Sequence, residues 1–484
     1  MVLNSLRFAA FFLIFLVVLF ALPKKARKYW LCAGNCLFYL SWERWSCILL
    51  LLSVLIIWFS GCRIQESGSK GRGPMAGGRR QWFGRNICLF LPVLWNVGLL
   101  VFFRYTGLID SLLSRFRISM PLSADNILAP LGLSFYTLRC ISYIADVWRG
   151  TIRPRKNPLD VFLYVSFFPQ IISGPIERPG AFFRELDDFE TKDLRNFTAI
   201  RDGFLLFVWG LFLKIVLAER LSVITAHLFG SYQNYGFWEL LTASIAYTMQ
   251  IYCDFGGYSE MSRGISAMIG FSTMRNFRQP YLALGIKNFW RRWHISLTSW
   301  LTDYIYIPLG GSRKGLLRKY VNIIIVFLVS GLWHGNTLNF IFWGLLHAIY
   351  QILEDLWSRT GQKLPNWLSW SITFAEVNFA WIFFNAGGLN RGFRIIRQIF
   401  SHFTIPGSFD TGLVPGNLAV LGFGLLILFL VDLFHEKGVP INQRFAALPL
   451  PLRWLILLGL FWSVIMLGIY GVGYDTSGFI YAQF

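Results

Sequence analysis

An apolar run at residues 321–335 of this 484-residue chain ends in the string Gly331-Leu332-Trp333-His334-Gly335. An apolar segment of about this length can enter a bilayer, where a titratable side chain is costly and is therefore usually functional. Glycines on both sides of the Trp-His pair let another backbone or a ligand approach closely. We therefore predict a functional role for His334, with a structural histidine bonded to a backbone carbonyl as the alternative.

The composition is that of a polytopic membrane protein. Hydrophobic residues make up 55% of the chain, aromatic residues 18% and charged residues only 14%, whereas soluble proteins carry roughly a quarter charged residues. The net charge of +20 falls in short clusters between apolar runs, which indicates topology signals and anionic lipid headgroups rather than nucleic acid. The seven cysteines form no paired motif, so we expect neither a disulfide framework nor a metal site.

The apolar runs predict an all-α fold of membrane-spanning helices. A helical crossing takes about 20 residues, and we expect about eleven true crossings, with some shorter runs as half-helices inside the protein. The candidate spans are residues 6–23, 29–42, 46–61, 82–103, 127–148, 158–175, 199–218, 237–254, 321–335, 338–354, 366–386, 417–434 and 453–473.

The basic clusters predict the topology. Placing the clusters within 24–28, 63–80 and 149–156 in the cytoplasm makes residues 29–61 a hairpin that turns at 42–45, with the N-terminus outside. The more polar stretches 176–200 and 274–316 are expected to lie at the membrane surface as amphipathic helices. We expect one intramembrane domain, 1–484, with N-terminal helices at 1–126, a catalytic core at 127–350 and C-terminal helices at 351–484.

A second histidine, His294, lies in an aromatic and basic stretch that allows two interpretations. At helical spacing Trp290, Trp293, Leu297 and Trp300 share one side, Arg291 and Arg292 fall elsewhere, and Ser296 and Asp303 lie near one face. The stretch is either an interfacial helix with tryptophan anchors or the wall of a pocket whose arginines meet a charged donor.

Polar residues also interrupt other apolar runs. Gln170 lies between Pro169 and Gly174, and Asp254 lies close to Gly256, Gly257 and Tyr258. Broken helices at membrane depth line cavities or protein interiors. These side chains either satisfy freed backbone groups or line a polar tunnel.

The chain contains none of the motifs of a serine hydrolase, an intramembrane zinc protease or a nucleotide-binding protein. A histidine without a nucleophile motif is best suited to act as a general base on an external hydroxyl. This chemistry fits acyl transfer from a thioester to an alcohol, with His294 orienting the substrates or stabilising the oxyanion.

These motifs together resemble the membrane-bound O-acyltransferases, in the branch of the alginate O-acetyltransferases (AlgI) and the D-alanyl transfer proteins (DltB), with the AlgI side favoured. The resemblance covers 130–350 most strongly and rests on the strings 131–136 with Asp146, 167–175, 254–259, 289–297, 303–311 and 331–335, with a further signature at 380–386. Thr302 and Asn385 depart from the family pattern, which often has arginine at both positions, and residues 336–339 are also unusual.

The resemblance implies a funnel-shaped fold with a through-membrane tunnel, His334 as the catalytic histidine and His294 as the second. The residues expected to bind substrate are Trp333, Gln170, Arg291, Arg292, Trp290, Ser296, Asp303, Tyr258 and Asp254. No cofactor is expected to be bound permanently; the donor would be acetyl-coenzyme A or an acyl-phosphopantetheine thioester.

The predicted function is transfer of an acetyl group across the cell (inner or plasma) membrane for O-acetylation of an extracellular polysaccharide such as alginate. The expected partners are membrane lipids, an extracytoplasmic acetyltransferase or acyl-relay protein, the polysaccharide acceptor and an acyl carrier protein. The alternatives are D-alanyl transfer to teichoic acid, a proton-coupled transporter that uses the histidines as a relay, and a scaffold for polysaccharide export.

Overall fold

The computed structural model describes residues 1–42, 44–69, 79–114, 129–403 and 409–469. These residues are helical over most of their length, and none of them forms a β-strand, which confirms the all-α prediction. They fall into two compact units: residues 1–203 with 265–274, and residues 204–264 with 275–484.

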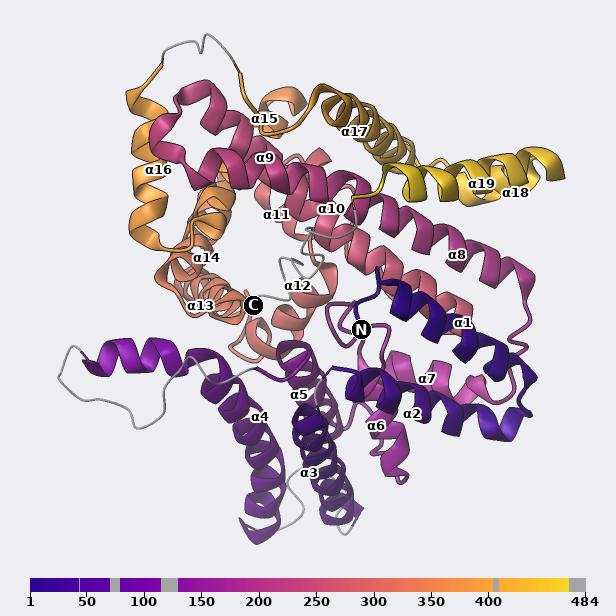
Figure 1. Cartoon of the computed structure of the whole chain (residues 1–484). Helices are drawn as coiled ribbons and strands as arrows, with labels where there is room; N and C mark the ends of the chain where they lie inside the picture. The colour runs from indigo at the N-terminus through magenta and orange to yellow at the C-terminus, as the bar shows by residue number, and fades with distance from the viewer. Residues whose placement is uncertain (43, 70–78, 115–128, 404–408, 470–484) are drawn as a thin grey trace. The chain divides into compact units, whose positions relative to one another are not determined.

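Among its described residues, the first unit contains seven complete helices and the start of an eighth. They are α1 (Leu6–Ala21), α2 (Lys24–Leu40), α3 (Arg44–Ser69), α4 (Arg79–Ser114), α5 (Leu133–Arg149), α6 (Pro158–Ser166), α7 (Pro179–Phe189) and the first residues of α8 (Phe197–Leu211). α2 ends at Leu40 and α3, which contacts α2, begins at Arg44, so a helix boundary falls where the hairpin was expected to turn. The orientation of this hairpin in the membrane stays a prediction. α3 packs against α4 (Figure 1).

The predicted span at 158–175 is wrong as a single helix. α6 ends at Ser166 and the chain continues through turns to residue 174. Asn35 of α2 anchors the break, since its amide donates to Ser166 Oγ at 3.1 Å and accepts from the Phe168 backbone N–H at 3.0 Å. The Phe168 ring then lies 5.4 Å from Phe15 and 5.6 Å from Phe38, so the broken segment is packed inside the unit.

Within the stretch 176–200, residues 179–189 form the amphipathic helix α7. α7 begins with Pro179 at its first turn and buries Phe182, Phe183, Leu186 and Phe189 on one face, while its charged residues lie largely outward. Whether this helix touches a membrane surface stays a prediction.

The second unit continues α8 and carries the histidines. Its further elements are η2 (Phe212–Ala218), α9 (Glu219–Gly230), η3 (Tyr232–Asn234), α10 (Phe237–Ile269, of which the last residues belong to the first unit), η4 (Pro280–Leu282), α11 (Ile286–Trp290), α12 (Ile295–Leu301), η5 (Thr302–Tyr306), α13 (Leu316–His334), α14 (Leu338–Arg359), α15 (Asn366–Asn385), α16 (Leu389–Ser401), α17 (Pro415–Glu436), α18 (Ile441–Ala447) and α19 (Leu450–Leu467).

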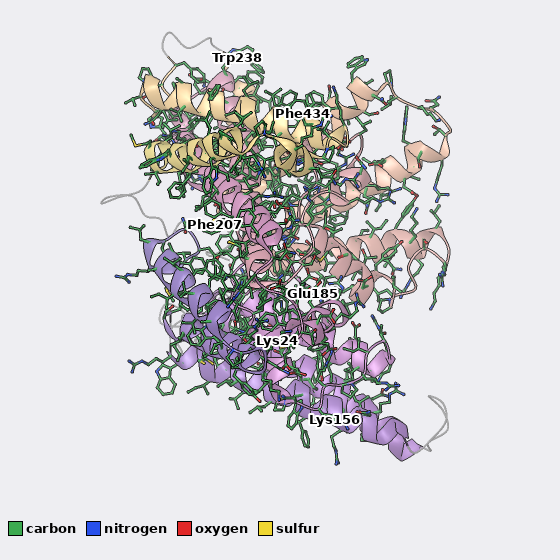
Figure 2. The ribbon with its side chains drawn as sticks, turned by 90° about the vertical axis from the view of Figure 1, so that its right-hand side faces the viewer. Lys24, Lys156, Glu185, Phe207, Trp238 and Phe434 are labelled. Carbon is green, nitrogen blue, oxygen red and sulfur yellow. The ribbon has the colours of Figure 1, made fainter. Side chains whose placement is uncertain are left out.

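Five helices of the described chain are long and apolar enough to cross a membrane: α3, α4, α13, α17 and α19. Many of their apolar side chains are exposed; Phe434 of α17, for example, has an exposed fraction of 46%. Trp238 of α10 is likewise 47% exposed (Figure 2). Such exposure suits helices that face lipid. The run at 321–335 belongs to a longer helix than its apolar residues indicated, since α13 begins at Leu316. The total of eleven crossings stays a prediction, and the boundary at 126–127 lies outside the described residues.

Candidate functional site

Close packing of α13 against α14 fixes the position of His334. A Cβ on Gly331 would lie 2.4 Å from the Phe340 carbonyl oxygen, and one on Gly344 would lie 2.3 Å from the Phe327 carbonyl oxygen. Both positions therefore need glycine, because any side chain would push the helices apart. The glycines beside His334 predicted that another backbone comes close to this helix, and that backbone belongs to α14.

We expect Gly331→Ala to destabilise the protein by about 1–3 kcal/mol, the usual cost of overpacking a close helix contact. Thermal unfolding of the detergent-solubilised variant measures the loss. Gly459→Ala is the matched control, because a Cβ there meets no atom within 4 Å. Equal stability of the Gly331 and Gly459 variants would contradict the packing described for α13 and α14.

His334 ends α13 inside a cage of aromatic rings. The side chain is 2% exposed, and its ring centroid lies 4.9 Å from Trp333, 5.1 Å from Trp343 and 5.3 Å from Phe384. The last contact comes from α15, within the signature at 380–386. The position at the carbonyl end of a helix favours a positive charge that develops on the imidazole.

Trp333 brings the two predicted histidines together. Its ring lies 6.0 Å from the His294 ring as well as 4.9 Å from that of His334. His294 is 1% exposed and packs edge-on against Phe255 of α10, at 4.6 Å. Two residues that are forty positions apart in the sequence therefore both pack against one indole.

The stretch around His294 is not one continuous helix. α11 ends at Trp290 and α12 begins at Ile295, with His294 in the left-handed region at φ 43°. Asn276 holds this break, because its carbonyl oxygen accepts from the Ile295 N–H at 2.9 Å and its side chain from the Ser296 N–H at 3.2 Å. His294 lies outside the five long apolar helices, and burial lowers its pKa to about 3, so the imidazole is neutral at pH 7 and carries one N–H that it can donate.

The four apolar residues at helical spacing are buried rather than lipid-facing anchors. Trp290, Trp293, Leu297 and Trp300 are exposed by no more than 6%. Two of them, Trp290 and Leu297, line a cavity of about 350 Å³ that we call the tryptophan pocket. The sequence left open whether this stretch forms an interfacial helix or a pocket wall. The structure favours the pocket wall, because the four residues are buried and two of them line a cavity.

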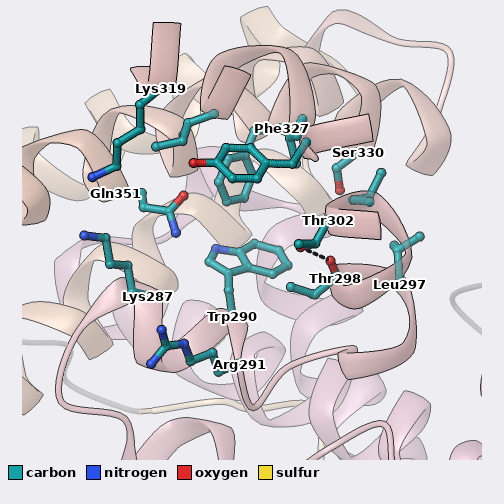
Figure 3. Close-up of a pocket in the computed structure, with 14 residues that line it drawn as sticks. Lys287, Trp290, Arg291, Leu297, Thr298, Thr302, Lys319, Phe327, Ser330 and Gln351 are labelled. Carbon is teal, nitrogen blue, oxygen red and sulfur yellow. Dashed lines mark hydrogen bonds between the residues drawn. The ribbon is translucent and has the colours of Figure 1, made fainter. Parts of the chain in front are cut away.

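The tryptophan pocket has two chemically different ends. Figure 3 shows Lys287, Lys319, Gln351 and Arg291 at one side and Ser330, Thr298, Thr302 and Leu297 at the other, with Trp290 and Phe327 between. Ser330 lies four residues before His334, on the same face of α13. Its buried Oγ has no hydrogen-bond partner among the residues that the structure describes.

An acidic residue of α14 organises the charged end. Asp355 accepts from Lys287 Nζ and from Lys319 Nζ at 2.6 Å each, and from Arg359 Nε at 3.2 Å. Partial burial opposes ionisation of this carboxyl, but the three hydrogen bonds outweigh it and lower its pKa. The lysines are held in place and the cluster keeps an excess of positive charge. Sequence analysis missed these residues, because they come together only in the fold.

The other predicted residues of the aromatic stretch lie in different places. Arg291 lines the tryptophan pocket. Arg292 forms a two-point contact with Glu436 of α17, at 2.7 and 2.9 Å. Ser296 is fully buried in α12, and Asp303 is half-buried in η5. Thr302, singled out as a departure from the family pattern, lines the pocket.

The polar residues of the predicted tunnel belong to different units. Gln170, in the first unit, accepts from the guanidinium of Arg139, which also donates to the Tyr164 carbonyl at 2.8 Å. Asp254, in the second, is 2.7 Å from Lys214 Nζ. Tyr258 is buried in α10. The tunnel stays a prediction.

Within the described residues, no group of three or more His, Cys, Asp or Glu side chains is placed to hold a metal ion.

Residues 35–393 match the membrane-bound O-acyltransferase (MBOAT) family. A Pseudomonas aeruginosa protein named "Probable alginate O-acetylase AlgI" is 34% identical over 459 residues, which cover 92% of this chain and 85% of the relative. The peptidoglycan O-acetyltransferase of Helicobacter pylori is 34% identical over 76% of this chain and 73% of its own length. The teichoic acid D-alanyltransferase of Bacillus subtilis is 30% identical over 54% of this chain and 69% of its own length.

Proposed function

Because the chain belongs to the membrane-bound O-acyltransferase family and is a multi-pass membrane O-acyltransferase, we propose that it transfers acetyl groups from a cytoplasmic thioester to an extracellular polysaccharide. The observation that carries this proposal is that His334 and His294 both pack against Trp333, with Ser330, one helical turn before His334, on the lining of a pocket.

The tryptophan pocket suits the donor. Coenzyme A and phosphopantetheine carry phosphates at one end and a slender arm with a thioester at the other. Lys287, Lys319 and Arg291 would hold phosphate through charge-assisted bonds, and the apolar middle of the pocket would enclose the arm. The Ser330 hydroxyl would donate to a carbonyl oxygen of the arm, which removes the cost of about 1–3 kcal/mol of a buried donor without an acceptor.

His334 acts as the general base in the proposed reaction. The imidazole takes the proton of the acceptor hydroxyl, whose oxygen attacks the thioester carbonyl carbon and forms a new C–O bond. The tetrahedral intermediate collapses, the C–S bond breaks, and the proton on the imidazole passes to the leaving sulfur. A neutral His294 is able to donate an N–H to the oxyanion, while the rings around both histidines exclude water, which would otherwise hydrolyse the thioester.

We propose a polysaccharide hydroxyl as the final acceptor, reached directly or through an extracytoplasmic acetyltransferase or acyl-relay protein. Support comes from relatives named for O-acetylation of alginate and of peptidoglycan, which cover more of the chain than the relative named for D-alanyl transfer. Gln170, Tyr258 and Asp254 remain candidates for lining the route of the acyl group. The proposed location is the inner or plasma membrane with the N-terminus outside, which an N-terminal alkaline phosphatase fusion tests by its activity.

The direct test incubates the purified protein with radiolabelled acetyl-coenzyme A, or with acetyl on a phosphopantetheinyl carrier protein, and with alginate as acceptor. Transfer of label to the polymer is expected from one of the two donors. Label on a teichoic acid with a D-alanyl carrier donor, and none on alginate, would replace the acetyl proposal with D-alanyl transfer. Uptake of a solute driven by protons, without transfer from any thioester, would contradict the proposal altogether.

Asp355→Asn is expected to raise KM for acetyl-coenzyme A by about tenfold, because the lysines at the charged end lose the carboxylate that positions them. Since the pKa of Asp355 is lowered, the contribution of this carboxylate to stability is present above its unfolded pKa of about 3.9. This contribution is lost only as the pH falls through the lower pKa of the folded state. The Asp355 carboxylate therefore stays ionised between pH 5 and pH 8, and the wild-type KM should not change through this group in that range.

Asp410→Asn, at an exposed site, is the control for Asp355→Asn. An unchanged KM in Asp355→Asn would contradict the role of the charged end.

A further inference from the structure

We propose that His347 is a positioning residue that fixes the indole of Trp290 across the tryptophan pocket and thereby sets the fit of the donor. This inference rests on the proposed function, because it takes the pocket as the donor site. His347 lies on α14, is fully buried, and is not itself on the pocket lining. It therefore acts on a bound molecule only through a neighbour.

The contact that carries the inference is the bond between the two side chains. Trp290 Nε1–H donates to His347 Nδ1 at 3.3 Å, and the two rings stand edge-on with centroids 4.9 Å apart. The Trp290 indole is 6% exposed and lies in the middle of the pocket (Figure 3). A small rotation of this large ring would therefore change the space left for the arm of the donor.

Neighbouring rings hold the imidazole itself in one orientation. Phe289 and Phe327 lie nearly parallel to it, at interplanar angles of 4° and 20°, and Trp343 lies 5.0 Å away. Trp343 in turn packs against His334, at 5.1 Å. His347 thus belongs to the same packed group of rings as the catalytic histidine, although its hydrogen bond points to the pocket wall.

The bond also identifies the ring nitrogen that matters. Because Nδ1 accepts from Trp290, the neutral imidazole carries its proton on Nε2. Nε2 has no hydrogen-bond partner in the described part of the chain, so the function of the residue depends on Nδ1. Asparagine places an acceptor close to the Nδ1 position, whereas glutamine places its amide near Nε2 and leucine offers no acceptor.

The experiment measures binding of coenzyme A to the detergent-solubilised full chain by titration calorimetry, and kcat and KM for acetyl-coenzyme A. We expect His347→Leu and His347→Gln to weaken binding and raise KM by about three- to tenfold, the effect of one lost hydrogen bond, with kcat changed less than about twofold. His347→Asn should restore most of the affinity. His402→Leu, at an exposed histidine, should leave both constants unchanged.

A double-variant cycle with Trp290→Phe completes the test. If both residues act through the same bond, Trp290→Phe combined with His347→Leu should weaken binding no more than Trp290→Phe alone. Wild-type affinity in His347→Leu, strict additivity in the cycle, or a fall in kcat at unchanged affinity would each overturn the inference and leave the proposed function standing. If His347→Leu does not fold, the contrast between the Asn and Gln variants decides. Absence of coenzyme A binding and turnover in the wild type would instead remove the proposed donor, and the inference with it.

Discussion

Replacement of His334 by alanine is expected to lower kcat for acetyl transfer by about 10²- to 10⁴-fold, the usual contribution of a positioned general base. The residue ends α13 within a cage formed by Trp333, Trp343 and Phe384 and is 2% exposed. Affinity for coenzyme A should change little, because His334 is not on the lining of the tryptophan pocket. Single-turnover transfer from radiolabelled acetyl-coenzyme A measures the loss.

Folding must be intact for that result to count. Alanine leaves a small cavity within the aromatic cage, and such a cavity lowers stability. Thermal unfolding and coenzyme A binding of His334→Ala are therefore measured alongside its activity. His227→Ala serves as the matched control, since this histidine is about one-third exposed and bonds to Tyr235. A folded His334→Ala protein that acetylates at the wild-type rate would show that another group removes the proton.

The second large effect concerns stability. Lys214 is expected to contribute strongly to stability, because its side chain is 3% exposed and its ammonium group lies 2.7 Å from Asp254 and 2.8 Å from Glu219. Removing one partner of a buried ion pair costs about 3–5 kcal/mol, since the remaining charges are left without compensation. Lys214→Met should therefore lower the unfolding temperature by several degrees or prevent accumulation of folded protein.

Lys214 lies where two helices pack closely, and its two carboxylate partners compensate its buried charge. It lies in the π-helical turn η2, where α8 and α10 approach so closely that a Cβ on Gly210 would be 2.4 Å from the Gly257 carbonyl oxygen. Lys314→Met, at an exposed lysine, is the control. Double replacement of Lys214 by Met and Asp254 by Leu should recover part of the lost stability. A stable Lys214→Met protein with reduced acetyl transfer would instead favour the predicted role of Asp254 in substrate binding.

The sequence predicted those features that depend on local patterns. Apolar runs placed most of the helices, because helix formation in this chain follows hydrophobicity over short stretches. The hairpin over 29–61 was predicted from the basic clusters on either side of it. His334 stood out because a titratable group in an apolar run has few structural reasons to be there.

Other features could not be predicted, because they depend on contacts between distant residues. The break at His294 depends on Asn276, which lies in a preceding segment and accepts hydrogen bonds from the first two backbone N–H groups of α12. The end of α6 depends on Asn35, over a hundred residues earlier. Lys214 was not predicted as a partner of Asp254, although a lysine in one apolar run indicates an acidic partner in another.

Ser330 shows how a site residue escapes sequence analysis. It lies inside the apolar run that contains His334, where a serine would ordinarily bond to the carbonyl four residues earlier, as Ser142 does with Leu138 at 2.8 Å. Only the structure shows that its hydroxyl makes no such bond within the described residues and faces a pocket instead.

In the proposed function, an imidazole enclosed within the protein moves an acetyl group from a thioester on one side of the membrane to a hydroxyl on the other. Proteoliposomes loaded with radiolabelled acetyl-coenzyme A, with the polysaccharide and any extracytoplasmic partner outside, measure this directly. Label on the external polymer is expected with the wild-type protein, and only background label with folded His334→Ala protein. Equal labelling by the two proteins, or labelling only when donor and acceptor share one compartment, would exclude transfer across the membrane by His334.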